Sequence, residues 1–252
     1  MFDLKGKVTV ITWASSWLWK QMAKWFAQQW SDLVILARRY HLLVELKGTL
    51  EAYWVKVFPI KCDVTSTKDV DNAAKLAEKH FWKVDILINC AWASKNAGVL
   101  NMKDEEWDFT VKSDLTSVFK VTRAFAKIMK KNKHWRIINI ASTYGLVWNK
   151  ELSTIAYHAA KWWVVNFTRG IAAELAKYNI TCNAICPGYF NTELTKQILE
   201  TKKFKRYAEQ FVPMKRYGQE WELNAWAIFL ASDEASYVTW VILPIDWWYT
   251  CI

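Results

Sequence analysis

The chain has 252 residues, of which 53% are hydrophobic and 23% are charged, and its formal net charge is +10 at pH 7. This length and apolar content suffice for a substantial core, so we expect residues 1–252 to form a single α/β domain. The basic side chains are scattered along amphipathic stretches, and no stretch approaches the roughly 20 apolar residues of a membrane span. Neither a nucleic acid nor a membrane is therefore an expected partner.

The cysteines indicate the compartment. Their number, five, is odd, they are widely spaced, and no paired CxxC spacing for zinc occurs. Most lie in apolar runs that are typical of strands. Together with an N-terminus that lacks an apolar signal segment, this pattern favours reduced core thiols in a cytoplasmic protein without a metal site.

The first expected element is a β-branched strand over residues 7–12, followed by a turn that holds Trp13, Trp17 and Trp19. A helix then carries apolar residues at helical spacing over residues 22–27. A strand, a tight turn and a helix at the start of a chain are typical of the first unit of a dinucleotide-binding fold.

A second strand is expected over residues 33–36, and it ends at Ala37, Arg38 and Arg39. At this place an acidic residue would accept hydrogen bonds from the adenosine ribose, whereas an arginine accommodates a 2′-phosphate. The absence of an acid and the presence of two arginines favour NADP(H) over NAD(H). Two arginines at a strand end are also compatible with ordinary surface charge, so NAD(H) stays possible.

Further strands are expected along the rest of the chain, and the apolar runs that predict them are residues 57–64, 84–89, 137–141, 180–186 and 242–246. Helical patterns alternate with these strands. The sequence therefore predicts a doubly wound, Rossmann-type α/β fold with a parallel sheet of about seven strands.

Candidate chemistry lies around the fifth strand and the helix that follows it. Tyr157 and Lys161 stand four residues apart and so on one helix face, and Ser142 directly follows the strand over residues 137–141. A phenol is a poor proton carrier at neutral pH, and a neighbouring cation that favours the phenolate makes it more useful. A tyrosine and a lysine at this spacing more often form a solvated helix face, so the combination with Ser142 carries the hypothesis.

The order of Ser142, Tyr157 and Lys161 resembles the catalytic set of the short-chain dehydrogenase/reductase family, from about Asp3 to the C-terminus. The resemblance implies reversible hydride transfer between a nicotinamide cofactor and a small secondary alcohol or ketone. Tyr157 would exchange the alcohol proton, Lys161 would lower the pKa of Tyr157 and bind the ribose, and Ser142 would hydrogen-bond the substrate oxygen. Asp114 stands where the family usually has an asparagine that supports a water beside the lysine.

The resemblance also implies a set of cofactor-binding positions. These are Thr12, Trp13, Trp17, Trp19, Arg38, Asp63, Asn89, Lys161, Pro187, Gly188 and Thr192. Residues 193–218 resemble a mobile lid over the substrate. Residues 177–190 resemble the gluconate 5-dehydrogenase branch, with 3-oxoacyl carrier-protein reductases as close relatives, which suggests a sugar acid such as gluconate as substrate. A homotetramer is implied as well.

Tryptophan stands where that family has glycine. The chain holds 7 glycines and 18 tryptophans, although glycine averages about 7% of residues in proteins. Trp13, Trp17 and Trp19 occupy the glycine positions of the dinucleotide turn, which need close backbone approach to the pyrophosphate, and Trp92 replaces a further family glycine. Trp30 falls at a helix C′ position, where left-handed backbone is usual. An alternative hypothesis is therefore a cofactor-free, catalytically silent or poorly folded scaffold.

Overall fold

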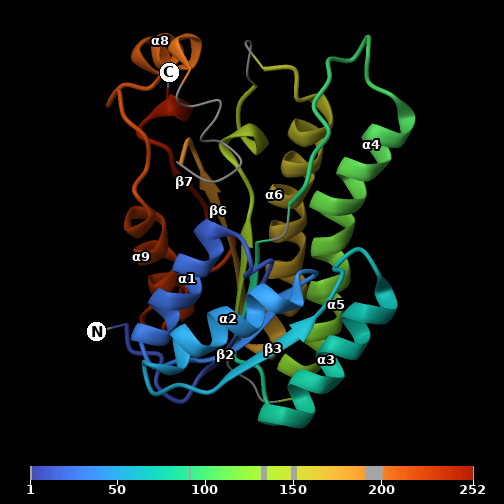
Figure 1. Ribbon diagram of the computed structural model, residues 1–252, viewed down its shortest axis with the longest axis vertical. Helices are drawn as coiled ribbons and strands as arrows, with labels where there is room; N and C mark the ends of the chain where they lie inside the picture. Colours follow the sequence, from blue (N-terminus) through green and yellow to red (C-terminus); the bar gives the residue numbers. More distant parts are fainter. Residues whose placement is uncertain (1, 91, 132–134, 149–151, 191–200, 252) are drawn as a thin grey trace.

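A sheet of seven parallel strands forms the centre of the computed structural model, which describes residues 2–90, 92–131, 135–148, 152–190 and 201–251 (Figure 1). The strands are β1 (Val8–Thr12), β2 (Asp32–Ala37), β3 (Val57–Lys61), β4 (Ile86–Asn89), β5 (Trp135–Ile140), β6 (Ile180–Pro187) and β7 (Ile242–Ile245). Their order across the sheet is β3-β2-β1-β4-β5-β6-β7, so the direction of winding reverses between β1 and β4. This topology confirms the expected doubly wound fold.

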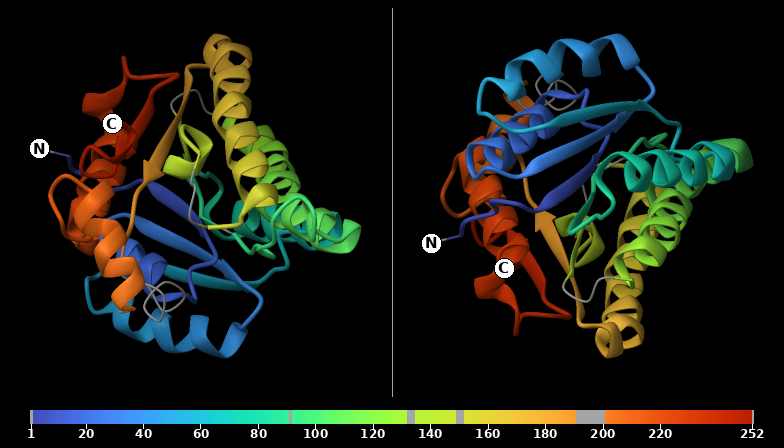
Figure 2. Two further views of the ribbon diagram at one scale, coloured as in Figure 1. Left: turned by 90° about the horizontal axis from the view of Figure 1, so that it is seen from above. Right: turned by 90° about the horizontal axis from the view of Figure 1, so that it is seen from below.

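Helices cover both faces of the sheet, as the views from above and below show (Figure 2). The helices are α1 (Trp17–Gln28), α2 (Tyr40–Glu51), α3 (Thr67–Phe81), α4 (Asp104–Val111), α5 (Ser117–Met129), α6 (Ile155–Leu175), α8 (Lys202–Phe211) and α9 (Glu220–Ala231). Side chains of α1, α2 and α9 share one buried cluster with the sheet, and those of α3, α5 and α6 share another. The sheet is therefore buried on both sides, which explains its runs of Val, Ile and Leu.

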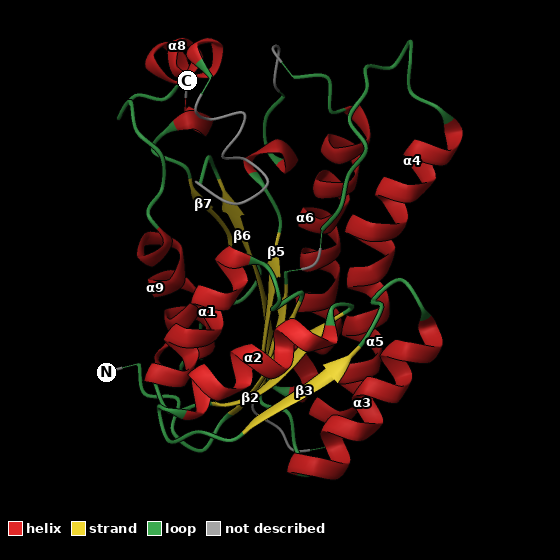
Figure 3. Ribbon diagram, viewed as in Figure 1, coloured by secondary structure: helices red, strands yellow, loops and turns green. Residues whose placement is uncertain are grey.

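Loops gather at the carboxyl ends of the strands (Figure 3). Every residue of β1 and β5 is buried, so these central strands hold their carboxyl ends rigidly at this edge. In open α/β folds, ligands bind outside the carboxyl ends near the point where the winding reverses. The fold thus predicts a site above β1, β4 and β5.

The third strand is shorter than the sequence indicated. It was expected over residues 57–64 but ends at Lys61, because the carboxylate of Asp63 accepts hydrogen bonds from the N–H and hydroxyl of Thr65, at 2.9 and 2.8 Å. This turn redirects the chain toward α3. The fourth strand likewise begins at Ile86 instead of residue 84.

Tryptophan occupies many of the positions with left-handed backbone. In the described part of the chain, ten residues other than glycine have positive φ, and seven of them are tryptophan: Trp13 (58°), Trp30 (59°), Trp54 (64°), Trp82 (63°), Trp240 (69°), Trp247 (52°) and Trp248 (68°). The prediction for Trp30, just beyond the end of α1, is confirmed. Left-handed backbone disfavours any residue with a Cβ, so each position carries local strain.

Candidate active site

A cavity of about 520 Å³ lies at the carboxyl edge of the sheet. Its lining includes Ser142, Tyr157 and Lys161, which the sequence placed in one catalytic set, together with Trp92 and Gly188. The structure therefore brings the three side chains together although they come from two different elements, the end of β5 and the first two turns of α6.

Ser142 is positioned by the 3₁₀ turn that follows β5. The Ser142 Oγ accepts a hydrogen bond from the N–H of Tyr144 at 3.1 Å and thereby caps that turn (Thr143–Gly145). The same hydroxyl hydrogen-bonds the phenol of Tyr157 and lowers its pKa. The hydroxyl groups of Ser142 and Tyr157 thus lie side by side in the cavity.

Lys161 is buried and anchored. Its Nζ donates to the carbonyl oxygen of Ile140, at the end of β5, at 3.1 Å, and lies 5.5 Å from the ring centroid of Tyr157. Burial lowers the pKa of Lys161, whereas the carboxylate of Asp114 raises it. The ammonium is consequently held in place beside the phenol by the strand end and by an opposite charge.

Asp114 lies in a π-helical segment (Lys112–Thr116) between α4 and α5. Its Oδ1 accepts from the N–H of Ala93 at 2.7 Å, while its buried Oδ2 has no hydrogen-bond partner in the described part of the chain. Burial raises the pKa of Asp114 to about 6, although Lys161 and the Ala93 N–H favour the carboxylate. π-Helical segments within α-helices often occur at functional sites, and here the π-helical segment directs the carboxylate of Asp114 toward Lys161.

The pKa of Tyr157 shifts upward in this site. Burial, followed by the negative charge of Asp114, raises the pKa of Tyr157, and the hydrogen bond with Ser142 opposes this only in part. The lowering expected from Lys161 does not decide the direction of the shift, because desolvation of the phenolate outweighs the stabilisation that neighbours provide. Tyr157 is a neutral phenol, and so a proton donor, at neutral pH.

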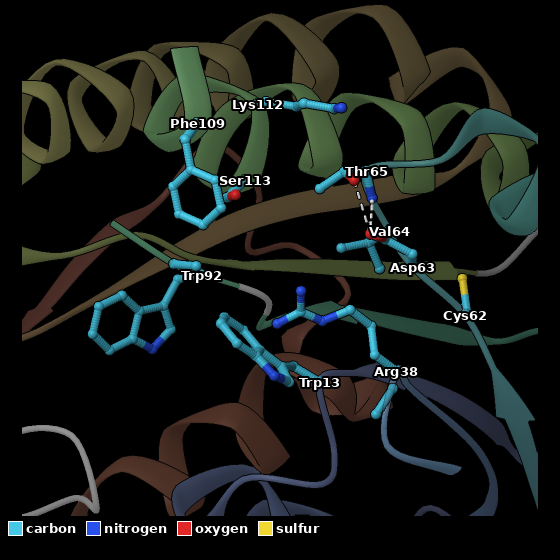
Figure 4. A pocket seen from close by; sticks show the side chains of 12 residues that line it. Trp13, Arg38, Cys62, Asp63, Val64, Thr65, Trp92, Phe109, Lys112 and Ser113 are labelled. Atoms are coloured by element: carbon cyan, nitrogen blue, oxygen red, sulfur yellow. Dashed lines mark hydrogen bonds between the residues drawn. The ribbon is translucent and has the colours of Figure 1, made fainter. Parts of the chain in front are cut away.

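A second cavity, of about 190 Å³, lies beyond the ends of β2 and β3. Arg38, Asp63 and Thr65 line it, and Figure 4 shows the indole of Trp13 between Arg38 and Trp92. Arg38 and Asp63 thus occupy the side of the groove where the sequence placed the adenosine half of a dinucleotide. The side-chain groups of this cavity fit that half.

The turn between the two cavities does not fit a pyrophosphate. Trp13, with left-handed backbone, lines both cavities, and Trp19, in the first turn of α1, is 3% exposed and lines the larger one. A pyrophosphate needs the N–H groups of this turn and of the helix N-terminus at contact distance. The indoles occupy the space that the phosphates would fill. Trp17 opens α1, and its side chain lies outside the described part of the chain.

Trp92 extends the obstruction toward the catalytic set. Its ring centroid lies 6.3 Å from that of Trp13 and 5.8 Å from that of Tyr157. The indole that stands at the family glycine position therefore packs directly on the phenol that would exchange the substrate proton.

Thr12 and Asn89 lie beneath the cavity and join neighbouring strands. The Thr12 Oγ1 accepts from the N–H of Cys90 at 2.8 Å. The Asn89 amide donates to Thr122 at 3.0 Å and to Asn139 at 2.8 Å. Both residues thus hold the strand ends in register, and neither is among the residues that line the two cavities.

Pro187 and Gly188 line the catalytic cavity, as expected for the end of β6. The N–H of Gly188 donates to Ile245 at 2.9 Å, and a Cβ at Gly188 would lie 2.8 Å from the Cα of Asp246. Gly188 is therefore required for close approach of the two chain segments. Thr192, the remaining expected cofactor contact, lies outside the described residues.

Sequence reasoning missed a group of tyrosines beside the catalytic set. The hydroxyl groups of Tyr144 and Tyr189 lie 3.0 Å apart, and those of Tyr207 and Tyr249 lie 2.7 Å apart. Tyr144 also packs on Tyr157, with ring centroids 6.0 Å apart. The position of Tyr144, two residues after Ser142, was the available signal. The other three come from distant segments that only the fold brings together.

The described residues contain neither a membrane-spanning helix nor a cluster of metal ligands. No helix among them is both long and apolar enough to cross a membrane. In the same part of the chain, no group of three or more His, Cys, Asp or Glu side chains is arranged to hold a metal ion. All five cysteines are free.

Residues 19–250 match a protein-family model described as enoyl-(acyl carrier protein) reductase. Among curated proteins, the 3-oxoacyl-(acyl-carrier-protein) reductase of Thermotoga maritima is 32% identical over 243 residues, which cover 96% of this chain and 97% of that protein.

Solved structures resemble the whole chain. A putative gluconate dehydrogenase from Agrobacterium tumefaciens superposes with a TM-score of 0.95 at 27% identity, covering 100% of this chain and 98% of that one. The NADPH-dependent 3-quinuclidinone reductase from Rhodotorula rubra superposes with a TM-score of 0.94 at 29% identity, covering 100% and 94%.

Proposed function

Because the chain belongs to the short-chain dehydrogenase/reductase family of oxidoreductases, we propose that its site serves reversible hydride transfer between NADP(H) and a secondary alcohol or ketone. The observation that carries this proposal is the meeting of Ser142, Tyr157 and Lys161 in one cavity at the carboxyl edge of the sheet. These side chains form a proton-transfer set of the kind that carbonyl reduction requires.

Each side chain has a role that follows from its contacts. The neutral phenol of Tyr157 donates its proton to the carbonyl oxygen of a ketone as negative charge develops there. Ser142 orients the phenol through their hydrogen bond. Lys161, anchored on Ile140, places a positive charge beside the phenolate that remains after the proton has left.

The choice of NADP(H) over NAD(H) rests on the end of β2. Arg38 lines the adenosine-side cavity, and Ala37 occupies the position where an acidic residue would bind the ribose hydroxyls. The name of the 3-quinuclidinone reductase states NADPH dependence, which supports the same preference here.

Two substrate classes follow from the relatives. The likeness to a putative gluconate dehydrogenase supports a sugar acid such as gluconate, and the likeness to a 3-oxoacyl-(acyl-carrier-protein) reductase supports a 3-oxoacyl chain. We retain the sugar acid as the proposal, because residues 177–190 suggested it. Comparing the turnover rates of a sugar acid and of a 3-oxoacyl substrate with one preparation would decide between the two classes.

We further propose a cytoplasmic homotetramer. Four buried free thiols, at Cys62, Cys90, Cys182 and Cys186, favour a reducing compartment. Exposed aromatic side chains on α5 and α6, including Phe119 and the Trp162–Trp163 pair, favour an interface between subunits.

A second candidate is favoured by one specific observation. Because Trp13 and Trp19 occupy the turn that a pyrophosphate would need, the chain as it stands is a catalytically silent scaffold that retains the proton-transfer set but does not take up the dinucleotide. In that case, only a variant with glycine at the tryptophan positions of this turn would be active.

Titration calorimetry with NADPH tests both candidates. We compare the unchanged chain with a variant that carries glycine at positions 13, 17 and 19, and follow NADPH oxidation with ketone substrates. Negligible binding by the unchanged chain and measurable binding by the variant are expected, because glycine frees the backbone N–H groups for the phosphates.

The matched control carries glycine at positions 30, 54 and 82, which share left-handed backbone with Trp13 but line neither cavity. It should gain stability without gaining NADPH affinity. Tight NADPH binding by the unchanged chain would contradict the second candidate. A folded variant of the turn that binds no dinucleotide would contradict the first.

A further inference from the structure

The tryptophans that obstruct the dinucleotide turn also build aromatic walls around the catalytic cavity. Aromatic residues from several segments of the chain line one space, and they include Trp13, Trp19, Trp92, Tyr144, Tyr157 and Phe190. We propose that this cavity binds a flat aryl ketone in the absence of any dinucleotide. The proposal is independent of turnover, because it concerns the chain as it stands.

The ring geometry favours a flat aromatic ligand. Trp13 and Trp92 are inclined by 66°, Trp92 and Tyr157 by 56°, and Tyr144 and Tyr157 by 76°. Successive rings at these angles present both faces and edges toward the space that they border. Aromatic pairs prefer such offset or edge-to-face arrangements, so a ligand ring finds favourable partners on more than one side.

The polar end of the cavity favours an uncharged acceptor. Tyr157 is a neutral phenol that hydrogen-bonds Ser142 and can donate its proton to an oxygen in the cavity. Lys161 already donates to Ile140 and is paired electrostatically with Asp114, so its positive charge is largely compensated. A ketone oxygen matches this end better than a carboxylate does, because a carboxylate would be desolvated beside the charge of Asp114.

The size and enclosure of the cavity suit such a ligand. Its volume of about 520 Å³ falls within the range of roughly 300–1,000 Å³ that small-molecule sites have. Trp13, Trp92, Ala93 and Phe109 line this cavity and the adenosine-side cavity alike, so these residues lie where the two cavities meet. A ligand bound here therefore needs no dinucleotide to complete its walls.

Isothermal titration of the unchanged chain with 2-acetylnaphthalene, with no dinucleotide added, tests the proposal. A ligand of about 13 non-hydrogen atoms with ordinary ligand efficiency should bind with a Kd tighter than about 1 mM. 2-Ethylnaphthalene, which lacks the carbonyl, should bind about three- to tenfold more weakly, because one hydrogen bond is lost. Cyclohexyl methyl ketone, which keeps the carbonyl but has no aromatic ring, should also bind more weakly than 2-acetylnaphthalene.

Three variants locate the site. Trp92→Ala should weaken 2-acetylnaphthalene at least tenfold, whereas Trp92→Phe, which keeps an aromatic face and guards against loss of folding, should retain most of the affinity. Tyr157→Phe should reduce the affinity for the ketone to that for the hydrocarbon. Trp221→Ala, an exposed position on α9, is the matched control and should change nothing.

The outcomes separate this inference from the proposed function. Absence of binding by the unchanged, folded chain overturns the inference, as does binding that Trp92→Ala leaves unchanged. Neither result bears on NADPH binding by the glycine-turn variant, which tests the enzyme. Conversely, a glycine-turn variant without activity leaves the binding of the aryl ketone intact.

Discussion

The chemistry of the site depends on the protonation of two side chains, Tyr157 and Asp114. Burial keeps the Tyr157 phenol protonated and raises the pKa of the Asp114 carboxyl. Burial lowers the pKa of Lys161, and the charge of Asp114 raises it. At this scale desolvation dominates over charge pairing, because Asp114 and Lys161 are buried and Tyr157 is half-buried.

The first residue-scale prediction concerns Tyr157. In the variant with glycine at positions 13, 17 and 19, Tyr157→Phe should abolish ketone reduction, because it removes the proton donor while keeping the ring against Trp92 and Tyr144. Steady-state assays with NADPH measure the loss, and NADPH titration checks that the cofactor still binds. Retention of most of kcat with an unchanged pH profile would assign the proton donor elsewhere.

The second residue-scale prediction concerns Asp114. Its pKa of about 6 in the folded state exceeds the unfolded value near 4, so the native state holds the proton more tightly and the stability that Asp114 contributes is lost as pH rises from about 4 to about 6. Relative to Asp114→Asn, the unchanged chain should therefore lose about 1–3 kcal/mol of unfolding free energy between pH 4 and pH 7.

Urea unfolding at a series of pH values measures this difference. Other buried carboxyls such as Asp85 are present in both proteins and cancel in the comparison. A difference in unfolding free energy that is constant across the interval would show that Asp114 titrates as an ordinary carboxyl.

At the scale of the elements, helix ends carry the strain that tryptophan introduces. Trp82 caps α3 in left-handed backbone, its N–H bonds the carbonyl of Glu78 at 2.7 Å, and its indole is 81% exposed. The backbone of this position suits glycine, and an exposed indole contributes little by packing.

Trp82→Gly should therefore stabilise the protein by about 1–2 kcal/mol, because it removes the Cβ penalty and keeps the capping hydrogen bond. The matched control is Trp226→Gly, an exposed position inside α9, which should destabilise by about 1 kcal/mol, since glycine disfavours helical backbone. Thermal and urea unfolding measure both. If both substitutions changed the unfolding free energy in the same direction, the assignment of strain to the left-handed cap at Trp82 would be contradicted.

At the scale of the whole molecule, the strained positions are distributed over several turns. Trp30, Trp54, Trp82, Trp240 and Trp248 all combine left-handed backbone with an exposed indole and lie at separate turns. The effects of distant sites add, so the combined strain is a large part of a stability that is typically about 5–15 kcal/mol.

Replacing these five residues with glycine should raise the unfolding free energy by on the order of 5 kcal/mol and Tm by about 10–20 °C. Differential scanning calorimetry measures the shift. NADPH binding should stay negligible in this variant, because Trp13 and Trp19 remain in the turn. A Tm that does not rise would indicate that the left-handed backbone costs little in this chain.

The sequence alone was sufficient for several features of this protein. The seven-stranded fold followed from buried β-branched runs that alternate with helical patterns, and the left-handed position of Trp30 followed from its place after a helix. The likeness to a family predicted the joining of Ser142, Tyr157 and Lys161. The fold and the position of Trp30 follow from local periodicity and spacing, which a linear chain expresses directly, whereas the joining of the three side chains was implied by the family resemblance.

Only the tertiary structure decided the rest. The raised pKa of Tyr157 depends on burial by distant segments, and the position of Trp13 between two cavities depends on how β1, β2 and β4 close around it. The packing of Trp92 on Tyr157, and of Tyr189, Tyr207 and Tyr249 near them, joins segments that are far apart in sequence. Desolvation and packing arise from all neighbours in space at once, and no local pattern in the chain encodes them.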